Sequence, residues 1–192
     1  MKKKTFALLL SLVLVFGVVA GGTLAWLTQK TDSVVNTFTY GDINITLDET
    51  TGNDYKIIPG VNIHKNPKVT VTANSEACYL FVKVQVENWP TLVEADGTTK
   101  KVSYAIADGW TALEGQSGVY YREVSATDAK NGTSYNVLAG DTTYTDGVVT
   151  VSENLTKTDV NGLKANQPKL TFTAYAVQKD GIADVATAWS KI

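Results

Sequence analysis

Side chains that carry out catalysis or hold metals at neutral pH are scarce in this chain of 192 residues, which has one histidine, His64, and one cysteine, Cys78. A zinc peptidase of the common kind needs two histidines one helical turn apart with a glutamate between them, because both imidazoles must reach one metal ion while the carboxylate activates its water. The sequence contains no H-E-x-x-H motif, G-x-S-x-G elbow or glycine-rich phosphate loop. We therefore predict no catalytic residue, no resident metal and no cofactor.

The two reactive residue types have simpler interpretations. His64 lies in the stretch V-N-I-H-K over residues 61–65, which we interpret as a loop with a solvated imidazole. Cys78 adjoins the apolar run 79–86 and, as a single cysteine, has no partner for an internal disulfide. We expect a buried thiol that behaves as a small apolar side chain.

Acidic residues suggest weak binding hypotheses. They gather in two stretches, Asp141 with Asp146, and Asp48 and Glu49 with Asp54. Calcium takes six to eight oxygen ligands, yet neither stretch has the spacing of a known calcium loop. We interpret both stretches as solvated, turn-forming acids.

Aromatic residues suggest a second binding hypothesis, a platform on which a sugar ring stacks. The candidates are Trp89, Trp110, Tyr120, Tyr121 and Tyr144. Aromatic side chains of β-proteins more often fill a core or cover an edge, and we favour that interpretation. Tyr120 and Tyr121 point to opposite faces of a strand, so we expect one of them at the surface.

The first 25 residues have the three parts of a secretory signal. Three lysines, at positions 2–4, precede the apolar block 6–20, and small residues follow in G-G-T-L-A over 21–25. The block is shorter than the roughly 20 residues that a membrane-spanning helix needs. We therefore predict a signal helix over residues 1–25, cleavage between Ala25 and Trp26, and a protein that is secreted to the extracellular space or cell surface.

Two motifs surround the predicted cleavage point: G-G-T-L-A-W-L over residues 21–27 and, after a polar segment, N-T-F-T-Y-G-D-I-N-I over residues 36–45. Together they resemble the start of the TasA and camelysin family of secreted bacterial proteins. The segments 58–60, 66–71 and 77–84 look like the next strands of that family. The resemblance implies a SipW-type signal peptidase and biofilm-matrix fibres whose subunits are joined by N-terminal strands.

The mature chain has the size and charge of one ordinary exported domain. Removing residues 1–25 leaves 167 residues, with 14 of the 17 basic side chains and all 19 acidic ones. A mildly acidic chain without basic clusters is a poor ligand for nucleic acids or anionic membranes. We expect no nucleic-acid partner and membrane contact only through an uncleaved signal.

Hydrophobic alternation predicts an all-β domain over residues 37–192. In the stretch 42–48, Ile43, Ile45 and Leu47 share one face. The longest strand candidates are 79–87, which we place at the centre of the fold, and 169–178. Leu170, Phe172, Ala174 and Ala176 form the inner face of the latter strand. Shorter strands are predicted at 68–73, 101–106, 110–113, 119–124, 135–138 and 148–151, and a loop at 128–132.

One helical pattern follows the last strand. Ile182, Val185, Ala186 and Trp189 have the spacing of one helix face, so we predict a short C-terminal helix that caps an open end of the fold. Long and short strands with long connections suit a jelly-roll-like β-sandwich better than a meander. The expected architecture is this sandwich, preceded by the signal helix.

The arm 26–36, W-L-T-Q-K-T-D-S-V-V-N, contains no proline or glycine and begins with two large apolar residues. Once cleavage frees it, such an arm can add as a strand to a sheet edge of another copy. The expected contact residues are Trp26, Leu27, Val34, Val35 and Phe38. One arm and one edge used head to tail give a filament.

The sequence therefore predicts a secreted, self-assembling structural subunit of matrix or surface fibres, with other matrix proteins as further candidate partners. Three alternatives stay open. The arm packs on its own domain, the protein is a camelysin-like surface metallopeptidase, as the family name suggests, or it is a monomeric surface module that binds glycans or a host protein.

Overall fold

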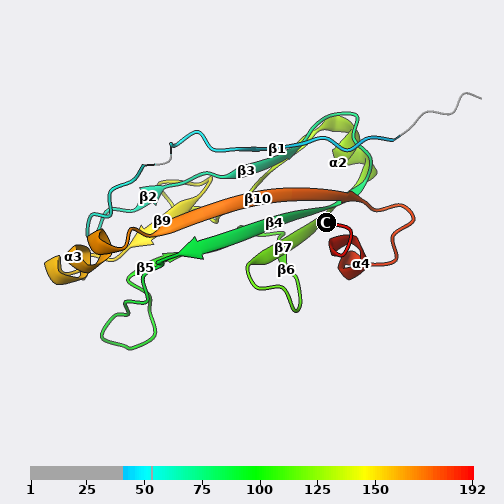
Figure 1. Cartoon of the computed structure of the whole chain (residues 1–192). Coiled ribbons are helices and arrows are strands. Elements are labelled where there is room, and N and C mark those ends of the chain that lie inside the picture. Colours follow the sequence, from blue (N-terminus) through cyan, green and yellow to red (C-terminus); the bar gives the residue numbers. More distant parts are fainter. Residues whose placement is uncertain (1–40, 53) are drawn as a thin grey trace, which may run out of the picture. The chain divides into compact units, whose positions relative to one another are not determined.

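The computed structural model describes residues 41–52 and 54–192, a mostly β body with three antiparallel sheets and a few short helices (Figure 1). The predicted signal 1–25, the arm 26–36 and Phe38 lie outside the described residues. The strands are β1 (Ile45–Asp48), β2 (Ile63–His64), β3 (Lys68–Val71), β4 (Cys78–Glu87), β5 (Val102–Tyr104), β6 (Thr111–Ala112), β7 (Val119–Val124), β8 (Thr133–Asn136), β9 (Val148–Val151) and β10 (Lys169–Gln178). The helices are α2 (Ala126–Asn131), α3 (Lys157–Ala165) and α4 (Val185–Trp189).

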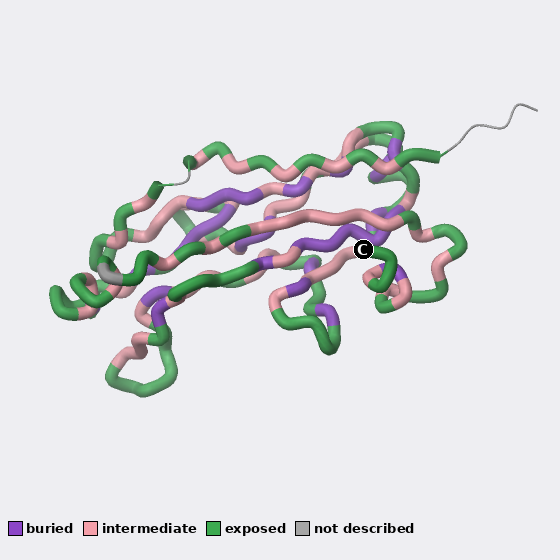
Figure 2. The backbone as a smooth tube through the Cα atoms, viewed as in Figure 1, coloured by how far each residue is buried: buried purple, intermediate pink, exposed green. Residues whose placement is uncertain are grey.

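Strand β4 is an inner strand of a four-stranded sheet with the order β10-β4-β7-β6. It pairs along its whole length with β10, from Cys78 opposite Gln178 to Glu87 opposite Lys169. The prediction that the stretch 79–87 is central and becomes polar only towards its end is confirmed. The first part of β4 is buried and its last three residues are exposed (Figure 2).

One face of this sheet packs on the sheet β1-β3-β8. Leu80 and Val82 of β4 share a core with Val69 and Val71 of β3, and all four are fully buried. The predicted inward faces of β1 and β10 are both confirmed, since their apolar residues pack against this core: Ile43, Ile45, Leu47, Leu170, Phe172, Ala174 and Ala176.

The other face of the same sheet is covered by helix α4. Trp189 lies 5.2 Å from Phe81 and 5.7 Å from Tyr175 between ring centroids. The prediction that this helix caps an open end is therefore wrong: its apolar face lies on the sheet, because the aromatic side chains there need a cover. Tyr121 packs in this second core and Tyr120 in the first, so neither is exposed and that prediction is also wrong.

The two smaller sheets, β1-β3-β8 and β2-β9-β5, are linked by backbone hydrogen bonds outside the named strands. Val137 N donates to Pro67 O at 2.9 Å, and Ala107 N donates to Val137 O at 3.0 Å. The first bond continues the pairing of β3 with β8, and the second joins the segment after β8 to the segment after β5. A third core, centred on Val102, Val149, Val151 and Leu155, lies under the sheet β2-β9-β5.

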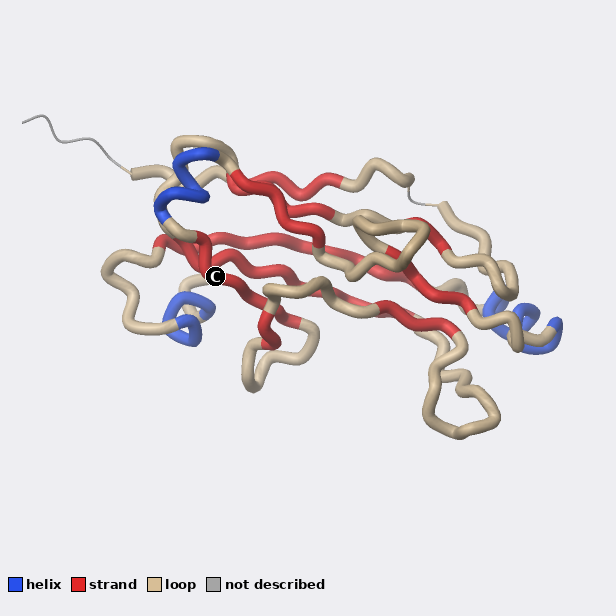
Figure 3. Tube along the Cα trace, turned by 180° about the vertical axis from the view of Figure 1, so that it is seen from behind, coloured by secondary structure: helices blue, strands red, loops and turns tan. Residues whose placement is uncertain are grey.

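Helices α2 and α3 occupy stretches without a strong apolar pattern. The predicted loop 128–132 is wrong, because α2 covers most of it, and α3 was not predicted. Each begins at a side-chain cap: Ser125 accepts from Asp128 N, and Thr156 accepts from Asp159 N in a reciprocal capping box. Figure 3 shows α2 and α4 near one end of the long strands and α3 near the other. None of the helices in the described part of the chain is long and apolar enough to cross a membrane.

The cover that α4 provides can be tested with Trp189→Ala. Losing a half-buried indole that contacts Phe81 and Tyr175 should lower the free energy of unfolding by about 2–3 kcal/mol, measured by urea denaturation. The matched control is Lys191→Ala, an exposed residue just after α4, which should change stability by less than about 0.5 kcal/mol. Equal stability of the two variants would contradict the placement of the helix.

Candidate functional site

The described part of the chain presents one long sheet edge. Strand β10 forms an outer edge of its sheet over ten residues, K-L-T-F-T-A-Y-A-V-Q, with no proline or glycine and one charge, Lys169, at its start. Soluble proteins usually protect such edges with charges, prolines, bulges or short strands. The opposite edge of the same sheet follows that rule, since β6 has only two residues. The backbone groups along the outer edge of β10 can therefore pair with another strand.

The hydrogen-bond register shows which groups of β10 are free. Lys179 N donates to Ala77 O at 2.9 Å and continues the β4–β10 register. Because bonded pairs alternate along an antiparallel ladder, odd-numbered residues of β10 bond to β4 and even-numbered residues point their N–H and C=O groups outwards. Among the described residues, no other strand pairs with this outer side.

Strand β1 presents a second edge beside the first. Thr72 N donates to Asn44 O at 2.8 Å, so even-numbered residues around β1 bond to β3 and odd-numbered ones face outwards. Strands β1 and β10 lie next to each other without pairing. The residues of both strands that carry inward apolar side chains are only half-buried, although four residues of the neighbouring strands β3 and β4 are fully buried: Val69, Val71, Leu80 and Val82. Figure 2 shows this difference between the strands along the backbone. We call this side of the molecule the open edge, made of Ile43, Ile45, Leu47, Leu170, Phe172, Ala174 and Ala176.

A pocket of about 280 Å³ lies at one end of the open edge, between the last residues of β1 and the first residues of β10. We call it the edge pocket; it is lined by Leu47, Asp48, Glu49, Pro67, Leu170, Thr171 and Phe172. It combines an apolar wall with the carboxylates of Asp48 and Glu49. Glu49 is paired with Lys65, and the exposed Asp48 suits a ligand that is both apolar and cationic.

A buried ion pair lies beside the edge pocket. Lys65 is only 7% exposed, and its Nζ lies 2.7 Å and 2.8 Å from the two carboxylate oxygens of Glu49. The ammonium also lies 5.1 Å from the ring centroid of Tyr55 and 5.5 Å from that of Phe172. Removing one partner of such a pair leaves an uncompensated charge, so it fixes the loop that follows β1.

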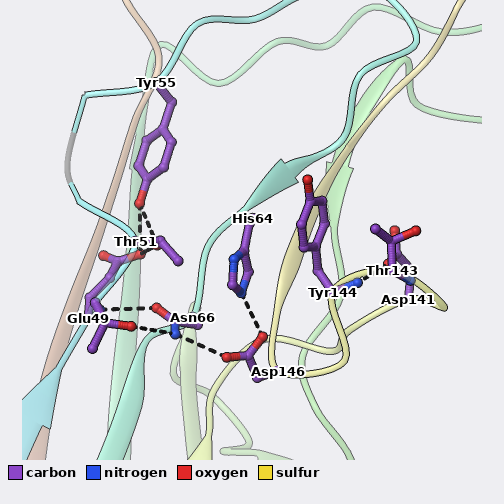
Figure 4. A network of polar contacts seen from close by, with 10 residues as sticks. Glu49, Thr51, Tyr55, His64, Asn66, Asp141, Thr143, Tyr144 and Asp146 are labelled. Atoms are coloured by element: carbon purple, nitrogen blue, oxygen red, sulfur yellow. Dashed lines mark hydrogen bonds and ion pairs between the residues drawn. The ribbon is translucent and has the colours of Figure 1, made fainter.

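A polar network continues from this pair (Figure 4). Asn66, also 7% exposed, donates through Nδ2 to Thr50 Oγ1 at 2.9 Å and to Asp146 Oδ2 at 3.0 Å. Asp146 Oδ1 lies 2.6 Å from His64 Nε2, and the imidazole stacks on Tyr144 with 4.6 Å between centroids. The hydrogen bond from Asn66, followed by that from His64, lowers the pKa of Asp146. We call Glu49, Thr50, His64, Lys65, Asn66 and Asp146 the polar joint, because they tie three separate chain segments together.

The prediction of a loop with a solvated histidine is wrong. His64 lies in β2, half-buried against Tyr144 and bonded to Asp146. The buried thiol is confirmed. Cys78 is fully buried, and burial raises its pKa to about 11.

The acids considered for calcium are bonded to protein donors. Asp141 Oδ1 accepts from Tyr144 N and Thr143 N at 2.6 Å and 2.7 Å, its Oδ2 accepts from Asn62 Nδ2, and these bonds lower its pKa. Glu49 is paired with Lys65. Within residues 41–52 and 54–192, no group of three or more His, Cys, Asp or Glu side chains could hold a metal ion. Both acidic stretches thus act in turns and joints.

The five aromatic candidates do not form one platform. Trp110 is buried in the main core, Tyr120 and Tyr121 pack into different cores, and Trp89 lies edge-on to Tyr104. Tyr144 stacks on His64. The interpretation as core and cover is confirmed for the set.

Sequence reasoning missed the polar joint. Lys65 and Asn66 look like loop residues, and their partners Glu49 and Asp146 lie 16 and 80 residues away in sequence. The only local signal is Asn66-Pro67, which breaks the strand path.

No protein-family model, curated protein or solved structure matches this chain. The resemblance to the TasA and camelysin family stays a prediction from the motifs around residues 21–45.

Asp146→Asn tests the polar joint. We expect a loss of about 1 kcal/mol in unfolding free energy at pH 7, because the amide gives up a charge-assisted bond to His64. A carboxylate whose pKa is lowered by folding stabilises the fold above its unfolded value of about 3.9, and this contribution disappears as the pH falls through the folded value. Below about pH 4, the variant should therefore lose less stability than the parent.

Urea denaturation at pH 7, 5 and 3 measures this difference. The control is Asp54→Asn, an exposed acid whose loss should leave both the stability and its pH dependence close to the parent's. Identical acid profiles for the parent and Asp146→Asn would show that the joint contributes nothing.

Proposed function

We propose that this protein is a secreted, non-catalytic structural subunit of extracellular matrix or surface fibres. The arm 26–36 of one copy, followed by Phe38, adds as a strand to the open edge of the next copy, so that the subunits join head to tail. The observation that supports this most strongly is the outer side of β10, which is ten residues long, is lined by half-buried apolar side chains and pairs with no strand in the described part of the chain.

The lengths of donor and acceptor agree. Ten residues of β10 span about 33 Å at 3.3 Å per residue, and an extended arm of eleven residues, 26–36, is of the same length. A strand in this place satisfies the outward N–H and C=O groups of Leu170, Phe172, Ala174 and Ala176. It also covers apolar surface that the fold leaves half exposed, which is the main favourable term in association.

The arrangement favours a filament over a closed ring. The donor is the segment that precedes Gly41, whereas the acceptor is an edge on the body, so the two surfaces differ. Heterologous contacts of this kind extend without limit unless their rotation happens to close. Each added copy then brings a new arm or a new edge.

Export and cleavage of the signal would determine where and when the edge of β10 pairs with another copy. On this proposal the chain belongs with TasA and camelysin, residues 1–25 direct it to the membrane, and a SipW-type peptidase cuts between Ala25 and Trp26. Copies with an uncut signal stay tethered, and cut copies assemble at the cell surface. Other matrix proteins are further proposed partners.

We also propose a jelly-roll-like β-sandwich for the domain 37–192. The support is that the sheet with β4 and the sheet with β3 bury one core between them. The bonds from Val137 to Pro67 and from Ala107 to Val137 join the two smaller sheets, as expected if they form one layer.

Assembly can be tested by comparing chains that begin at Trp26 with chains that lack residues 26–35. The first should elongate into fibres in electron microscopy and elute as large species in size-exclusion chromatography, and the second should stay monomeric. Ala174→Pro in the longer chain should also prevent assembly, because it removes an outward N–H of β10 without breaking a bond to β4.

The matched control is Ala174→Gly, which keeps the N–H and adds no volume, and it should still assemble. Circular dichroism confirms that each variant is folded. The proposal fails if chains that begin at Trp26 remain monomeric across concentration and pH, or if Ala174→Pro assembles as well as Ala174→Gly.

A further inference from the structure

We propose that the edge pocket is the seat for the first mature residue, Trp26, of a second copy, with its indole on the apolar wall and its α-ammonium on Asp48. This inference rests on the proposed fibre function and deepens it, because it gives the new N-terminus made by cleavage a binding site of its own.

The wall of the pocket suits an aromatic ring. Leu47, Pro67, Leu170 and Phe172 come from three chain segments and surround a volume of about 280 Å³. Large aromatic side chains bury about 150–250 Å² each and act as anchors at interfaces. The arm has one large aromatic residue near its free end, Trp26.

The charges of the pocket suit a cation. Glu49 is neutralised by Lys65, and Lys169 pairs with Glu87 at 3.3 Å. Asp48 is exposed, and within the described residues it has no ion pair within 4 Å, although Lys68 lies opposite it in the β1–β3 register. Among the residues that the structure describes, its carboxylate accepts one hydrogen bond, from Thr46 Oγ1, which leaves acceptor capacity for an N-terminal ammonium.

The direction of the strands places the end of the arm at the pocket. Glu76 N donates to Asp42 O and Lys179 N donates to Ala77 O, so the start of β1 lies near the end of β10. The edge pocket lies at the other end, where β1 stops and β10 begins. An arm that enters beside Gln178 and places Trp26 in the pocket runs parallel to β10 and antiparallel to β1, and it needs about 25 Å to reach the pocket. Residues 26–40 span up to about 50 Å, which leaves length to reach the next body.

The geometry favours a second copy over the chain's own arm. The chain enters the body at Gly41, at the end of the open edge remote from the pocket, so a copy could fill its own pocket only with an arm that reverses direction next to Gly41. Gly41 does not have the positive φ that tight hairpin turns require, and a Cβ on it would lie 2.7 Å from Glu76 Cγ. Residues 27–40 contain no glycine or proline to make a turn.

Cleavage then releases the arm from the signal and also changes the chemistry of the nitrogen of Trp26. Before it, the nitrogen of Trp26 is a neutral amide that continues into Ala25. After it, the same nitrogen is an α-ammonium, a group whose ordinary pKa is about 7.7–8.0, and it can bind a carboxylate. Only processed copies fit the pocket end of the open edge.

The test compares chains that begin at Trp26 with chains that begin at Ala25, which moves the ammonium by one residue and leaves the body unchanged. The measurement is the lowest protein concentration at which fibres form. We expect the Ala25 start to raise it about tenfold, as for the loss of one charge-assisted hydrogen bond. Asp48→Asn should raise it by a similar factor in chains that begin at Trp26, and should add little in chains that begin at Ala25.

The control is Glu114→Gln, which removes one exposed charge from the β6–β7 turn, far from the pocket, and should leave the threshold unchanged. Thermal unfolding shows whether Asp48→Asn keeps the fold. Fibres that form equally well from both starts, or with Asp48→Asn unchanged, overturn the ammonium seat and leave the proposed function standing. Monomers from both starts overturn the proposed function and this inference together, and monomers that protect Trp26 from solvent identify the chain's own arm as the occupant.

Discussion

The architecture depends on one constraint: β4 buries apolar side chains on both of its faces, so both faces need a cover. Leu80 and Val82 point to one side, and Tyr79 and Phe81 point to the other. The sheet with β3 covers the first side and α4 covers the second. This explains why an antiparallel sheet, which usually keeps one face in water, carries a helix on its outer side. It also explains why the cover ends where β4 becomes polar.

The two edge strands of the sheet that contains β4 differ in length. Strand β6 is too short to template another chain, whereas β10 is as long as β4 and has no strand on its outer side among the described residues. The proposed assembly uses this edge, because long edges without charges, prolines or bulges readily accept another strand. The polar joint stabilises the end of the open edge, because Lys65 and Asn66 bond to Glu49 and Thr50 in the loop after β1.

The sequence allowed good prediction wherever a local pattern reports on burial. Strict alternation located β1, β4 and β10 and their inward faces, because a strand exposes every second side chain to the same environment. Helix α3 was missed although Thr156 and Asp159 form a readable capping box, because its turns carry few apolar residues. The joint was beyond local reasoning: the burial of Asn66 depends on Asp146, which lies 80 residues later. The arm residues Trp26 to Phe38 stay a prediction from motif and position.

The pairing of β4 with β10 has a consequence for how the chain reaches its final form. Partners in this ladder are between 82 and 100 residues apart, from Glu87 with Lys169 to Cys78 with Gln178. The middle of the main sheet therefore cannot close until the last fifth of the polypeptide has been synthesised, and such non-local pairing is slow. If the chain is exported as we propose, this delay keeps the sheet incomplete during synthesis, so that the chain can pass unfolded through a secretion channel.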